Sequence, residues 1–414
     1  MSSSVLALHH GYRVAGGEER AATQLAELAE AQLGERVAWL YRDSTALTAT
    51  AAARGMLAGG FGARQVASAL EQTGADLLHA HNLFPTFGPA ALRSARRAGA
   101  AVVVHLHNTR LLCSVATNVR RGEDCTRCHG HWTAPGVVHR CRGSVPEAVV
   151  YGAALPRWRR EIVRLADAVI VPSVAARSRM LQLGLGLPAD AMYVVGGVAP
   201  QIARHSTASS GRFALLVSRL APEKDVPTAI EACAQAGVPL VIAGDGPERR
   251  RLQAYAGRER RPERARQAAT DILGEQLLTV LPTVEVRGTT IFTGQVDTST
   301  LAALRATACV ALSPSLAYET FGLSALESMA AALPTIGSRV GALPELLGDD
   351  ATVPPRDVAA LAQRIGELAG DNAAGMRAAA RAHAHANPQL VAARLRSAYA
   401  AAREQRFVRR AYRR

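Results

Sequence analysis

The sequence predicts an α/β protein with two doubly wound domains, each built around a parallel sheet. Short apolar runs that read as buried strands alternate with amphipathic helical stretches along most of the 414 residues, and this alternation is typical of βαβ units. The length exceeds what one ordinary core supports and suits two domains of roughly 150 to 200 residues. The alternation lapses between residues 196 and 212 into Gly, Pro, Ser and Thr, which places the domain boundary near residue 205.

The predicted strands fall into two series, one in each half of the chain. The first series lies at residues 5–8, 37–41, 76–80, 101–106 and 168–171. The second lies at residues 213–217, 239–243, 290–293, 310–312 and 335–337. Because doubly wound sheets bind ligands at the carboxyl ends of their strands, we expect the functional loops directly after these runs. Residues 247–288 exceed a usual crossover and suggest a local insertion.

Composition narrows the class of protein. Hydrophobic residues make up 49% of the chain and charged residues 20%, and no run approaches the roughly 18 consecutive apolar residues of a membrane span. The first residues lack the charged start and long apolar middle of an export signal. Six cysteines are too few for a disulfide framework in a chain of this length. A cytoplasmic protein with reduced thiols is expected.

The net charge of +14 leaves nucleic acid, an anionic membrane surface and phosphorylated ligands open as partners. Arginines gather between residues 249 and 266 and again from residue 403 to the end, outside the runs that read as core, and Arg409 to Arg414 are expected to be exposed. Aromatic residues are only 4%, and no stacking motif interleaves the basic runs, so nucleic-acid binding is disfavoured. Peripheral contact with the inner face of an anionic membrane stays open.

Two cations follow the first strand of the second half. Arg219 and Lys224 lie at its carboxyl end, where they can neutralise a diphosphate. Lys224 is the only lysine, so 48 − 1 = 47 of the basic residues are arginine. Either a compact ammonium is needed here because a guanidinium fork would not fit, or the position of the lone lysine is due to chance. Gly-Asp-Gly-Pro at 244–247 follows the next strand and is expected to line the same cleft.

Two carboxylates flank the start of a predicted helix after the strand at 310–312. Glu319 lies on the loop, and the helix is expected to begin near Phe321 to Leu323, so that its unpaired N–H groups can bind a phosphate. Glu327 lies eight residues after Glu319 and roughly 6 to 9 Å into the helix. One carboxylate can therefore reach a sugar while the other reaches a ribose.

The first half offers weaker signals. Gly16 and Gly17 follow the first strand and could let the backbone approach a ligand before a helix begins. His107 follows the strand at 101–106 and is read either as a reactive group or as a structural histidine of a loop. His79 and His81 frame another strand end, and we assign no chemistry to them.

Several of these motifs occur together and in order. Arg219-x4-Lys224, Gly-Asp-Gly-Pro, Glu319-x7-Glu327 and the later Gly341-Ala-Leu-Pro-Glu345 resemble the C-terminal domain of glycosyltransferase family 4. These are retaining enzymes of the GT-B fold, in which two Rossmann-like domains face one another across a cleft. The resemblance implies an N-terminal acceptor-side domain (residues 1–204), a C-terminal nucleotide-sugar domain (205–387) and a final helix (388–414) that returns to the first domain.

The resemblance also implies a role for each site residue. Arg219 and Lys224 would bind the diphosphate, Glu319 the sugar, the amides of Phe321, Gly322 and Leu323 a phosphate, and Glu327 the ribose. Gly16 and Gly17 would form the family's glycine-rich loop across from the diphosphate, and His107 would lie beside the reacting sugar. The donor would be a UDP-, GDP- or dTDP-sugar and the acceptor a hydroxyl group in glycan, glycolipid or glycosylated-metabolite synthesis.

The reaction that the resemblance implies is transfer with retention, by attack on the face from which the diphosphate departs. A phosphate oxygen takes the acceptor proton, and the cations with the helix amides stabilise the departing charge. No Asp-x-Asp pair lies in a loop that suits a metal clamp, so we expect catalysis without a divalent ion. A nucleotide-sugar epimerase or a sugar phosphorylase of the same fold remains the alternative, and a basic nucleic-acid-binding protein a distant one.

Four cysteines form a cluster with the spacing C-x11-C-x2-C-x12-C. Four thiolates that include a C-x2-C pair suit tetrahedral zinc, and the Gly, Asp, Thr and Pro around them indicate a loop that a metal could order. Structural zinc is expected, with redox-active or free thiols as the alternative. The ligands would be Cys113, Cys125, Cys128 and Cys141.

Overall fold

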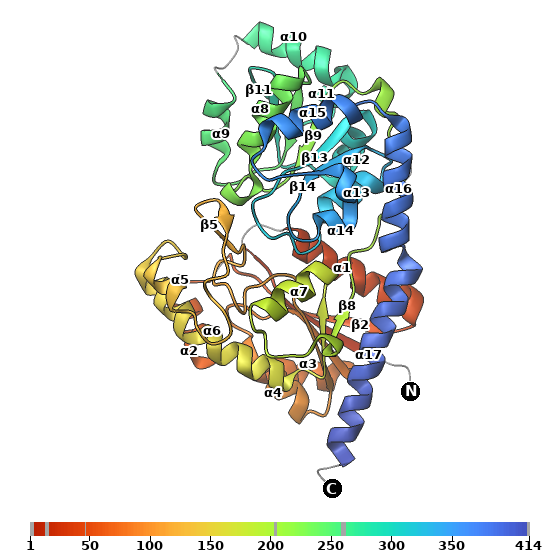
Figure 1. The fold of residues 1–414 in the computed structure, drawn as a ribbon. Coiled ribbons are helices and arrows are strands. Elements are labelled where there is room, and N and C mark those ends of the chain that lie inside the picture. Colours follow the sequence, from red (N-terminus) through yellow and green to blue (C-terminus); the bar gives the residue numbers. More distant parts are fainter. Residues whose placement is uncertain (1–3, 13–15, 46, 203–204, 258–261, 412–414) are drawn as a thin grey trace. The chain divides into compact units, whose positions relative to one another are not determined.

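A computed structural model describes residues 4–12, 16–45, 47–202, 205–257 and 262–411 of the chain. The chain divides into two compact units, each with its own parallel sheet (Figure 1). Unit 1 comprises Met1–Asn118, Cys125–Val198 and Pro388–Arg414, and unit 2 comprises Val119–Asp124 and Ala199–Asn387. The predicted α/β class with two doubly wound sheets is confirmed.

The sheet of unit 1 has six strands in the order β2-β1-β3-β4-β7-β8, and every neighbouring pair is parallel. The chain winds outward in both directions from the pair β1/β3, which makes this pair the switch point where such sheets bind ligands. The three-residue β8 was not predicted. The strands are β1 (Ser4–His10), β2 (Arg36–Arg42), β3 (Leu77–Asn82), β4 (Ala101–His105), β7 (Ala168–Val171) and β8 (Met192–Val194).

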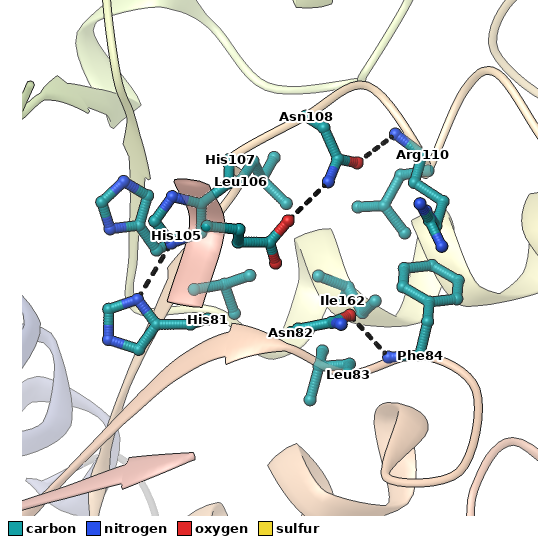
Figure 2. A pocket seen from close by; sticks show the side chains of 13 residues that line it. His81, Asn82, Leu83, Phe84, His105, Leu106, His107, Asn108, Arg110 and Ile162 are labelled. Carbon is teal, nitrogen blue, oxygen red and sulfur yellow. Dashed lines mark hydrogen bonds between the residues drawn. The ribbon is translucent and has the colours of Figure 1, made fainter. Parts of the chain in front are cut away.

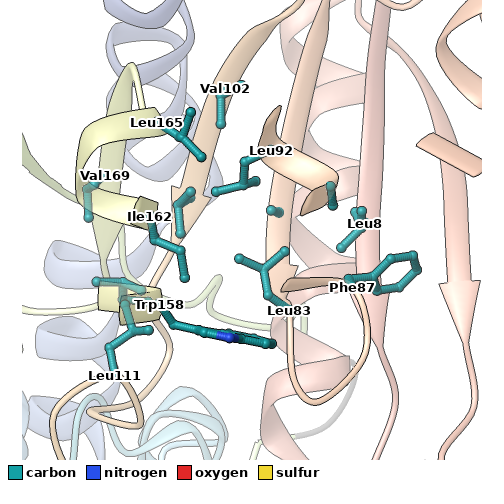
Figure 3. Close-up of a cluster of buried hydrophobic side chains, with 14 of the residues drawn as sticks. Leu8, Leu83, Phe87, Leu92, Val102, Leu111, Trp158, Ile162, Leu165 and Val169 are labelled. Carbon is teal, nitrogen blue, oxygen red and sulfur yellow. The ribbon is translucent and has the colours of Figure 1, made fainter. Parts of the chain in front are cut away.

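Helices cover both faces of this sheet. One face packs against α2, α3, α4 and α6, and its core is centred on Trp158 with Phe87, Leu92 and Val102 (Figure 3). The Trp158 indole N–H donates to the backbone oxygen of Met56 at 2.9 Å, so this buried polar group is satisfied. The helices are α1 (Gly17–Leu28), α2 (Ala49–Ala58), α3 (Ala63–Thr73), α4 (Gly88–Arg97), α5 (Ala134–Val138), α6 (Val145–Leu165) and α7 (Val174–Gln182).

The final helix, α17 (Pro388–Ala411), packs on the other face of the same sheet. Leu395 and Tyr399 are buried there against residues such as Leu77. Beyond them, Arg403 donates to both carboxylate oxygens of Glu35, at 2.7 and 2.9 Å. Hydrophobic burial and the charge-assisted hydrogen bonds of Arg403 therefore both hold this helix against the sheet of unit 1.

The prediction that Arg409 to Arg414 are exposed is wrong for Arg409. Arg409 forms an ion pair with Asp167, whose carboxylate is almost fully buried. The side chain of Arg410 and residues 412–414 lie outside the described residues. Among the helices that the structure describes, none combines the length and the apolar character needed to cross a membrane.

The sheet of unit 2 has seven strands in the order β11-β12-β10-β9-β13-β14-β15. Its pairs are parallel except β11/β12, and the chain winds outward in both directions from β9/β13. The switch point of unit 2 is therefore the gap between the loops that follow β9 and β13. The strands are β9 (Ala214–Val217), β10 (Leu240–Ala243), β11 (Glu285–Arg287), β12 (Thr290–Gly294), β13 (Val310–Ser313), β14 (Thr335–Ser338) and β15 (Thr352–Val353).

The expected insertion at 247–288 contributes to the core of this unit. Leu273, Leu277 and Val286 from it are buried against Phe213 and Ile291. A short hairpin of β5 (Val119–Arg120) and β6 (Glu123–Asp124) groups with the same unit. The helices are α8 (Val226–Ala236), α9 (Arg249–Tyr255), α10 (Pro262–Leu273), α11 (Glu275–Val280), α12 (Thr298–Thr307), α13 (Leu323–Ala330), α14 (Leu343–Leu347), α15 (Val358–Leu368) and α16 (Asn372–Ala386).

Candidate functional site

The loops after β9 and β13 meet through an ion pair at the switch point of unit 2. Lys224 Nζ donates to Glu319 Oε1 at 2.5 Å, and the Ser315 hydroxyl donates to the same oxygen at 2.9 Å. Backbone contacts join the loops as well, because Leu316 N donates to Glu223 O at 2.8 Å. Two residues 95 positions apart in the sequence are thus brought into contact where the sheet topology places a ligand.

Glu319 is held as a carboxylate. Burial alone would raise its pKa, but the charge of Lys224 and the hydrogen bonds from Lys224 and Ser315 outweigh burial and lower the pKa below its usual value. The Glu319 side chain is 16% exposed and that of Lys224 is 27% exposed. Both groups therefore keep an accessible edge while their positions are fixed.

The Gly-Asp-Gly turn supports the loop that carries Arg219. A Cβ at Gly246 would lie 2.3 Å from the backbone oxygen of Leu220, and one at Gly244 would lie 1.9 Å from that of Ser218. Leu220 N also donates to Asp245 O at 2.9 Å. The glycines thus allow two strand-end loops to pack backbone against backbone.

Arg219 projects from this supported loop. Its side chain is 56% exposed and forms an ion pair with Glu223, four residues later. A guanidinium in this position can still bind an incoming anion, because surface pairs of this kind are worth little.

The later Gly-Ala-Leu-Pro-Glu motif supports the Glu319 loop from the other side. Gly341 has φ +58°, and a Cβ on it would lie 2.2 Å from the Glu319 backbone oxygen. Ala342 N donates to that oxygen at 2.8 Å. The motif therefore sets where the Glu319 carboxylate can lie.

Helix α13 begins where the sequence placed it. Gly322 is its N-cap in the left-handed region, with φ 91°, and Phe321 and Leu323 on either side are half-buried. The Ser324 hydroxyl donates to the backbone oxygen of Val217 at 2.9 Å, which fixes the helix start beside the end of β9. The N–H groups at this helix start and the Lys224 ammonium thus belong to the same strand-end region.

Glu327 is more deeply placed than the sequence suggested. It is 2% exposed, and its Oε2 accepts from Arg305 Nη2 of α12 at 2.5 Å. Sequence reasoning missed Arg305. An arginine between Leu304 and Ala306 on an amphipathic helix was the available signal, because a buried arginine needs a buried carboxylate.

A pocket in unit 1 opens at the carboxyl ends of β3 and β4 (Figure 2). Asn108 Nδ2 donates to Glu18 Oε2 at 2.9 Å, and the Tyr12 hydroxyl donates to the same oxygen at 3.0 Å. Burial raises the pKa of Glu18, and nearby Arg110 counteracts it. This polar lining, with His107, suits a hydroxyl-bearing ligand.

Gly16 and Gly17 lie at the start of α1 beside this pocket. Gly16 is the N-cap, and its N–H donates to Glu19 Oε2 at 2.9 Å. Tyr12 N donates to Glu19 Oε1 at 3.0 Å. The Glu19 carboxylate therefore joins the backbone of Tyr12 to that of Gly16 at the start of α1. The glycines alone did not reveal this arrangement.

His107 lies in a group of histidines rather than alone. His81 Nδ1 lies 3.0 Å from His107 Nε2, and the rings of His105 and His107 stack at 3.9 Å (Figure 2). Burial, followed by the neighbouring His79 and His9, lowers the pKa of His107 to about 3, so its imidazole is neutral. Sequence reasoning assigned His79 and His81 no chemistry and did not consider His105.

The four predicted zinc ligands are partly buried cysteines. Burial, together with the charges of the other three sulfurs, raises the pKa of Cys128 to about 11, although a hydrogen bond with the Gly136 backbone lowers it. Among the described residues, the four sulfurs do not form a set of potential ligand atoms within 4.8 Å of one another. Zinc at Cys113, Cys125, Cys128 and Cys141 stays a prediction.

The two units each match a family profile of known proteins. Residues 3–197 match the family profile described as Glycosyl transferase 4-like domain, and residues 211–371 match that described as Glycosyl transferases group 1. Glycogen synthase of Mycobacterium tuberculosis is 31% identical over 239 residues, which cover 55% of this chain and 50% of the relative. A GDP-mannose-dependent alpha-(1-6)-phosphatidylinositol dimannoside mannosyltransferase of the same species is 38% identical over 138 residues, 32% of this chain and 28% of the relative. The chain thus spans about half the length, or less, of these curated relatives.

A solved structure supports the same assignment at the level of the fold. Anabaena HepE, determined in complex with UDP and glucose, superimposes with a TM-score of 0.60 at 17% identity, covering 95% of this chain and 98% of that chain. The two family profiles follow one another along the chain, and the motifs at the switch point of unit 2 agree with them. The chain therefore belongs to the family 4 glycosyltransferases, which have the GT-B fold.

Proposed function

We propose that the protein transfers a hexosyl group from a nucleotide-diphosphate sugar to an acceptor hydroxyl, with retention at the anomeric carbon. The contact between Lys224 and Glu319 at the switch point of unit 2 supports this most strongly. It joins a cation suited to a phosphate and a carboxylate suited to a sugar hydroxyl, beside the N–H groups at the start of α13.

In this proposal unit 2 binds the donor. Arg219 and Lys224 neutralise the diphosphate, the amides of Phe321 to Leu323 contact a phosphate, Glu319 accepts from sugar hydroxyls and Glu327 accepts from the ribose. Negative charge grows on the diphosphate as the glycosidic bond breaks. Fixed cations and helix amides therefore stabilise the transition state more than the ground state, which is the condition for catalysis.

Unit 1 binds the acceptor in the same proposal. The acceptor hydroxyl lies in the pocket lined by Glu18, Asn108 and Arg110, with the neutral imidazole of His107 beside the reacting sugar. The hydroxyl oxygen forms the new bond on the face from which the diphosphate leaves, and its proton passes to the departing phosphate oxygen. No protein nucleophile and no divalent ion take part in the chemical step, so turnover should not require added Mg²⁺ or Mn²⁺.

The relatives suggest the substrate class. Glycogen synthase and the mannosyltransferase are named for hexose transfer, and HepE was solved with UDP and glucose. We propose glucose or mannose as the transferred sugar, carried by UDP, GDP or dTDP.

The test is to incubate the protein with UDP-, GDP- and dTDP-hexoses, with and without oligosaccharide acceptors, and to follow the products by NMR. Release of nucleoside diphosphate that depends on an acceptor, with an α-linked product from an α-linked donor, is expected. A β-linked product would contradict retention. Epimerised sugar formed without an acceptor would contradict transfer.

We also propose that the four clustered cysteines hold a structural zinc ion. Four partly buried thiols within one loop region support this, because thiolates that raise one another's pKa are stabilised by a cation. Cys125→Ser should contain about one zinc less per chain than the wild type and should lose local order around residues 113–141. Equal zinc content in both proteins would contradict the proposal.

We further propose a cytoplasmic protein that contacts the inner face of an anionic membrane through the end of α17. Phe407 is 66% exposed and Val408 is 44% exposed, next to basic residues of the same helix, a combination typical of interfacial helices. Phe407→Ser should weaken binding to vesicles of acidic lipid, and high salt should abolish binding. Wild-type binding to neutral vesicles alone, or none to acidic ones, would contradict this proposal.

A further inference from the structure

Three histidines from two neighbouring strands gather on one face of the sheet of unit 1. His79 and His81 are two residues apart on β3 and therefore point to the same side of the sheet. His105 is the last residue of the adjacent β4. One ring nitrogen from each of the three lies within 4.8 Å of the other two. All three are buried, with exposures of 2%, 6% and 2%.

This cluster leaves polar atoms unsatisfied in the core. Among the residues that the structure describes, neither ring nitrogen of His105 has a hydrogen-bond partner, and the same holds for Nε2 of His79. A buried donor or acceptor without a partner costs roughly 1 to 3 kcal/mol, and a bound water or ion is one explanation for such a group in a native structure. The unsatisfied nitrogens of His79 and His105 belong to rings that stack at 5.6 Å.

The surrounding residues orient two of the rings. His79 Nδ1 lies 2.9 Å from the hydroxyl oxygen of Tyr399 on α17, so Nδ1–H can donate to Tyr399 and leave the lone pair on Nε2. His81 Nδ1 is engaged with His107 at 3.0 Å. A hydrogen bond on one ring nitrogen that fixes the other as a ligand is the usual outer-shell arrangement of a metal-bound histidine.

From these contacts we infer that His79, His81 and His105 bind a divalent transition metal ion of the imidazole-preferring kind, such as Zn²⁺. Three neutral imidazoles suit zinc, copper, nickel or cobalt and do not suit magnesium or calcium, which take oxygen ligands. His81 and His105 line the pocket of Figure 2, which gives the ion a path to the cluster. The inference rests on unit 1 alone and does not depend on the proposed transfer reaction.

The ion would join β3 and β4 below the pocket and would fix His81, which contacts His107. Its role is therefore structural, as a clamp beneath the acceptor side. The cluster contains no thiol, so its spectrum differs from that of the clustered cysteines. Bound Co²⁺ gives visible d–d absorption at either site, but only thiolate ligands add charge-transfer absorption in the near ultraviolet.

The experiment titrates chelator-treated, reduced full-length protein with Co²⁺ and then displaces it with Zn²⁺. Apart from any equivalent that the cysteines bind with charge-transfer absorption, we expect about one equivalent of Co²⁺ that gives d–d absorption without charge transfer. This equivalent should be absent in His105→Leu and present in Cys125→Ser. His10→Gln is the matched control, because His10 is equally buried but has its own partner in the Thr86 hydroxyl, at 3.0 Å; it should bind as the wild type does.

Tyr399→Phe is a second variant that tests the inference if His105→Leu does not fold. It removes only the hydroxyl that orients His79, and the Co²⁺ dissociation constant should rise about tenfold or more. No thiol-free equivalent in the folded wild type would overturn the inference. So would an unchanged equivalent in folded His105→Leu, or, where that variant does not fold, an unchanged dissociation constant in Tyr399→Phe.

Discussion

Lys224 is the only lysine of the chain, and its ammonium contacts the Glu319 carboxylate at the switch point of unit 2. Lys224→Arg keeps the charge but replaces a compact ammonium with a planar fork that prefers bidentate geometry. We expect kcat to fall at least about tenfold, equivalent to roughly 1.4 kcal/mol, and to fall further in Lys224→Met. Donor affinity should change less than kcat, because charge on the diphosphate grows in the transition state.

Steady-state kinetics with varied donor concentration measure kcat, and calorimetry measures the donor Kd. Near-full activity in Lys224→Arg would mean that only the charge matters. Near-full activity in Lys224→Met as well would show that this loop does not serve the diphosphate.

The buried ion pair of Arg305 and Glu327 leads to a second prediction about individual residues. Removing either partner leaves the other charge buried and uncompensated, so Arg305→Met and Glu327→Leu should each cost about 3 to 5 kcal/mol of unfolding free energy. The double variant should recover much of that loss, because two apolar side chains replace both charges. Urea unfolding of the four proteins measures this, and additive losses in the double variant would contradict a mutual pair.

The residues of unit 2 were predictable because they follow strands, and parallel strands end at one edge of a sheet. Arg305 was not predictable in the same way, since its partner lies on another helix and no local spacing links them. The histidine cluster was missed because His79, His81 and His105 read individually as buried strand residues. Only the register of β3 with β4 shows that they lie together.

At the scale of elements, the Gly-Ala-Leu-Pro-Glu motif should be required for the position of the Glu319 loop. Gly341→Ala places a Cβ 2.2 Å from the Glu319 backbone oxygen, so the loop must move. Gly237→Ala is the matched control, because Gly237 has a similar φ of +70° but no atom within 4 Å of its Cβ position. Donor affinity, measured by calorimetry, should fall at least about tenfold in Gly341→Ala only. Equal losses in both variants would mean that backbone strain, not the Glu319 loop, is responsible.

The ion pair between Arg403 of α17 and Asp76 leads to a prediction about the pH dependence of stability. Burial would raise the pKa of Asp76, but its hydrogen bond and ion pair with Arg403 lower it overall. A lowered folded-state pKa stabilises the protein at pH above the unfolded-state pKa, about 3.9, and the effect is lost as pH falls through the folded-state pKa. Asp76→Asn should therefore lower the urea midpoint at pH 7, with the difference from wild type shrinking in acid.

Asp190→Asn removes a solvent-exposed aspartate and serves as the control for the change of charge. It should unfold as the wild type does at both pH values. A difference between Asp76→Asn and wild type that is independent of pH would contradict a role for the ionised carboxylate.

The longer elements were predictable and the short ones were not. Strands of four or more residues gave clear apolar runs, whereas β8, β11 and β15 have two or three residues and too little pattern to detect. The segment at 247–288 was predicted as an insertion because of its length and charge. Its core contribution through Leu273, Leu277 and Val286 depends on helix packing that charge composition does not reveal.

For the whole molecule, the alternation of strands and helices was enough to predict two doubly wound sheets, and the order of motifs was enough to predict the family. The nucleotide, the sugar and the acceptor were not predictable, because side chains on loops recognise them individually. The pairing of Arg409 with Asp167 was also missed, since a basic tail reads as solvated unless a buried carboxylate of another element is known to face it.

The most direct test of the donor site compares nucleoside diphosphate binding in three proteins. Arg219→Gln removes an exposed cation after β9, and Arg250→Gln removes an exposed cation from α9 of the same unit, with the same change of charge. Thermal shift and calorimetry with UDP, GDP and dTDP should show one nucleotide that, at about 100 times its Kd, stabilises the wild type and Arg250→Gln by about 2.7 kcal/mol. Its Kd should rise about tenfold or more in Arg219→Gln. Equal affinity in all three proteins, or no binding of any of the nucleotides to the wild type, would contradict a donor site at the strand ends of unit 2.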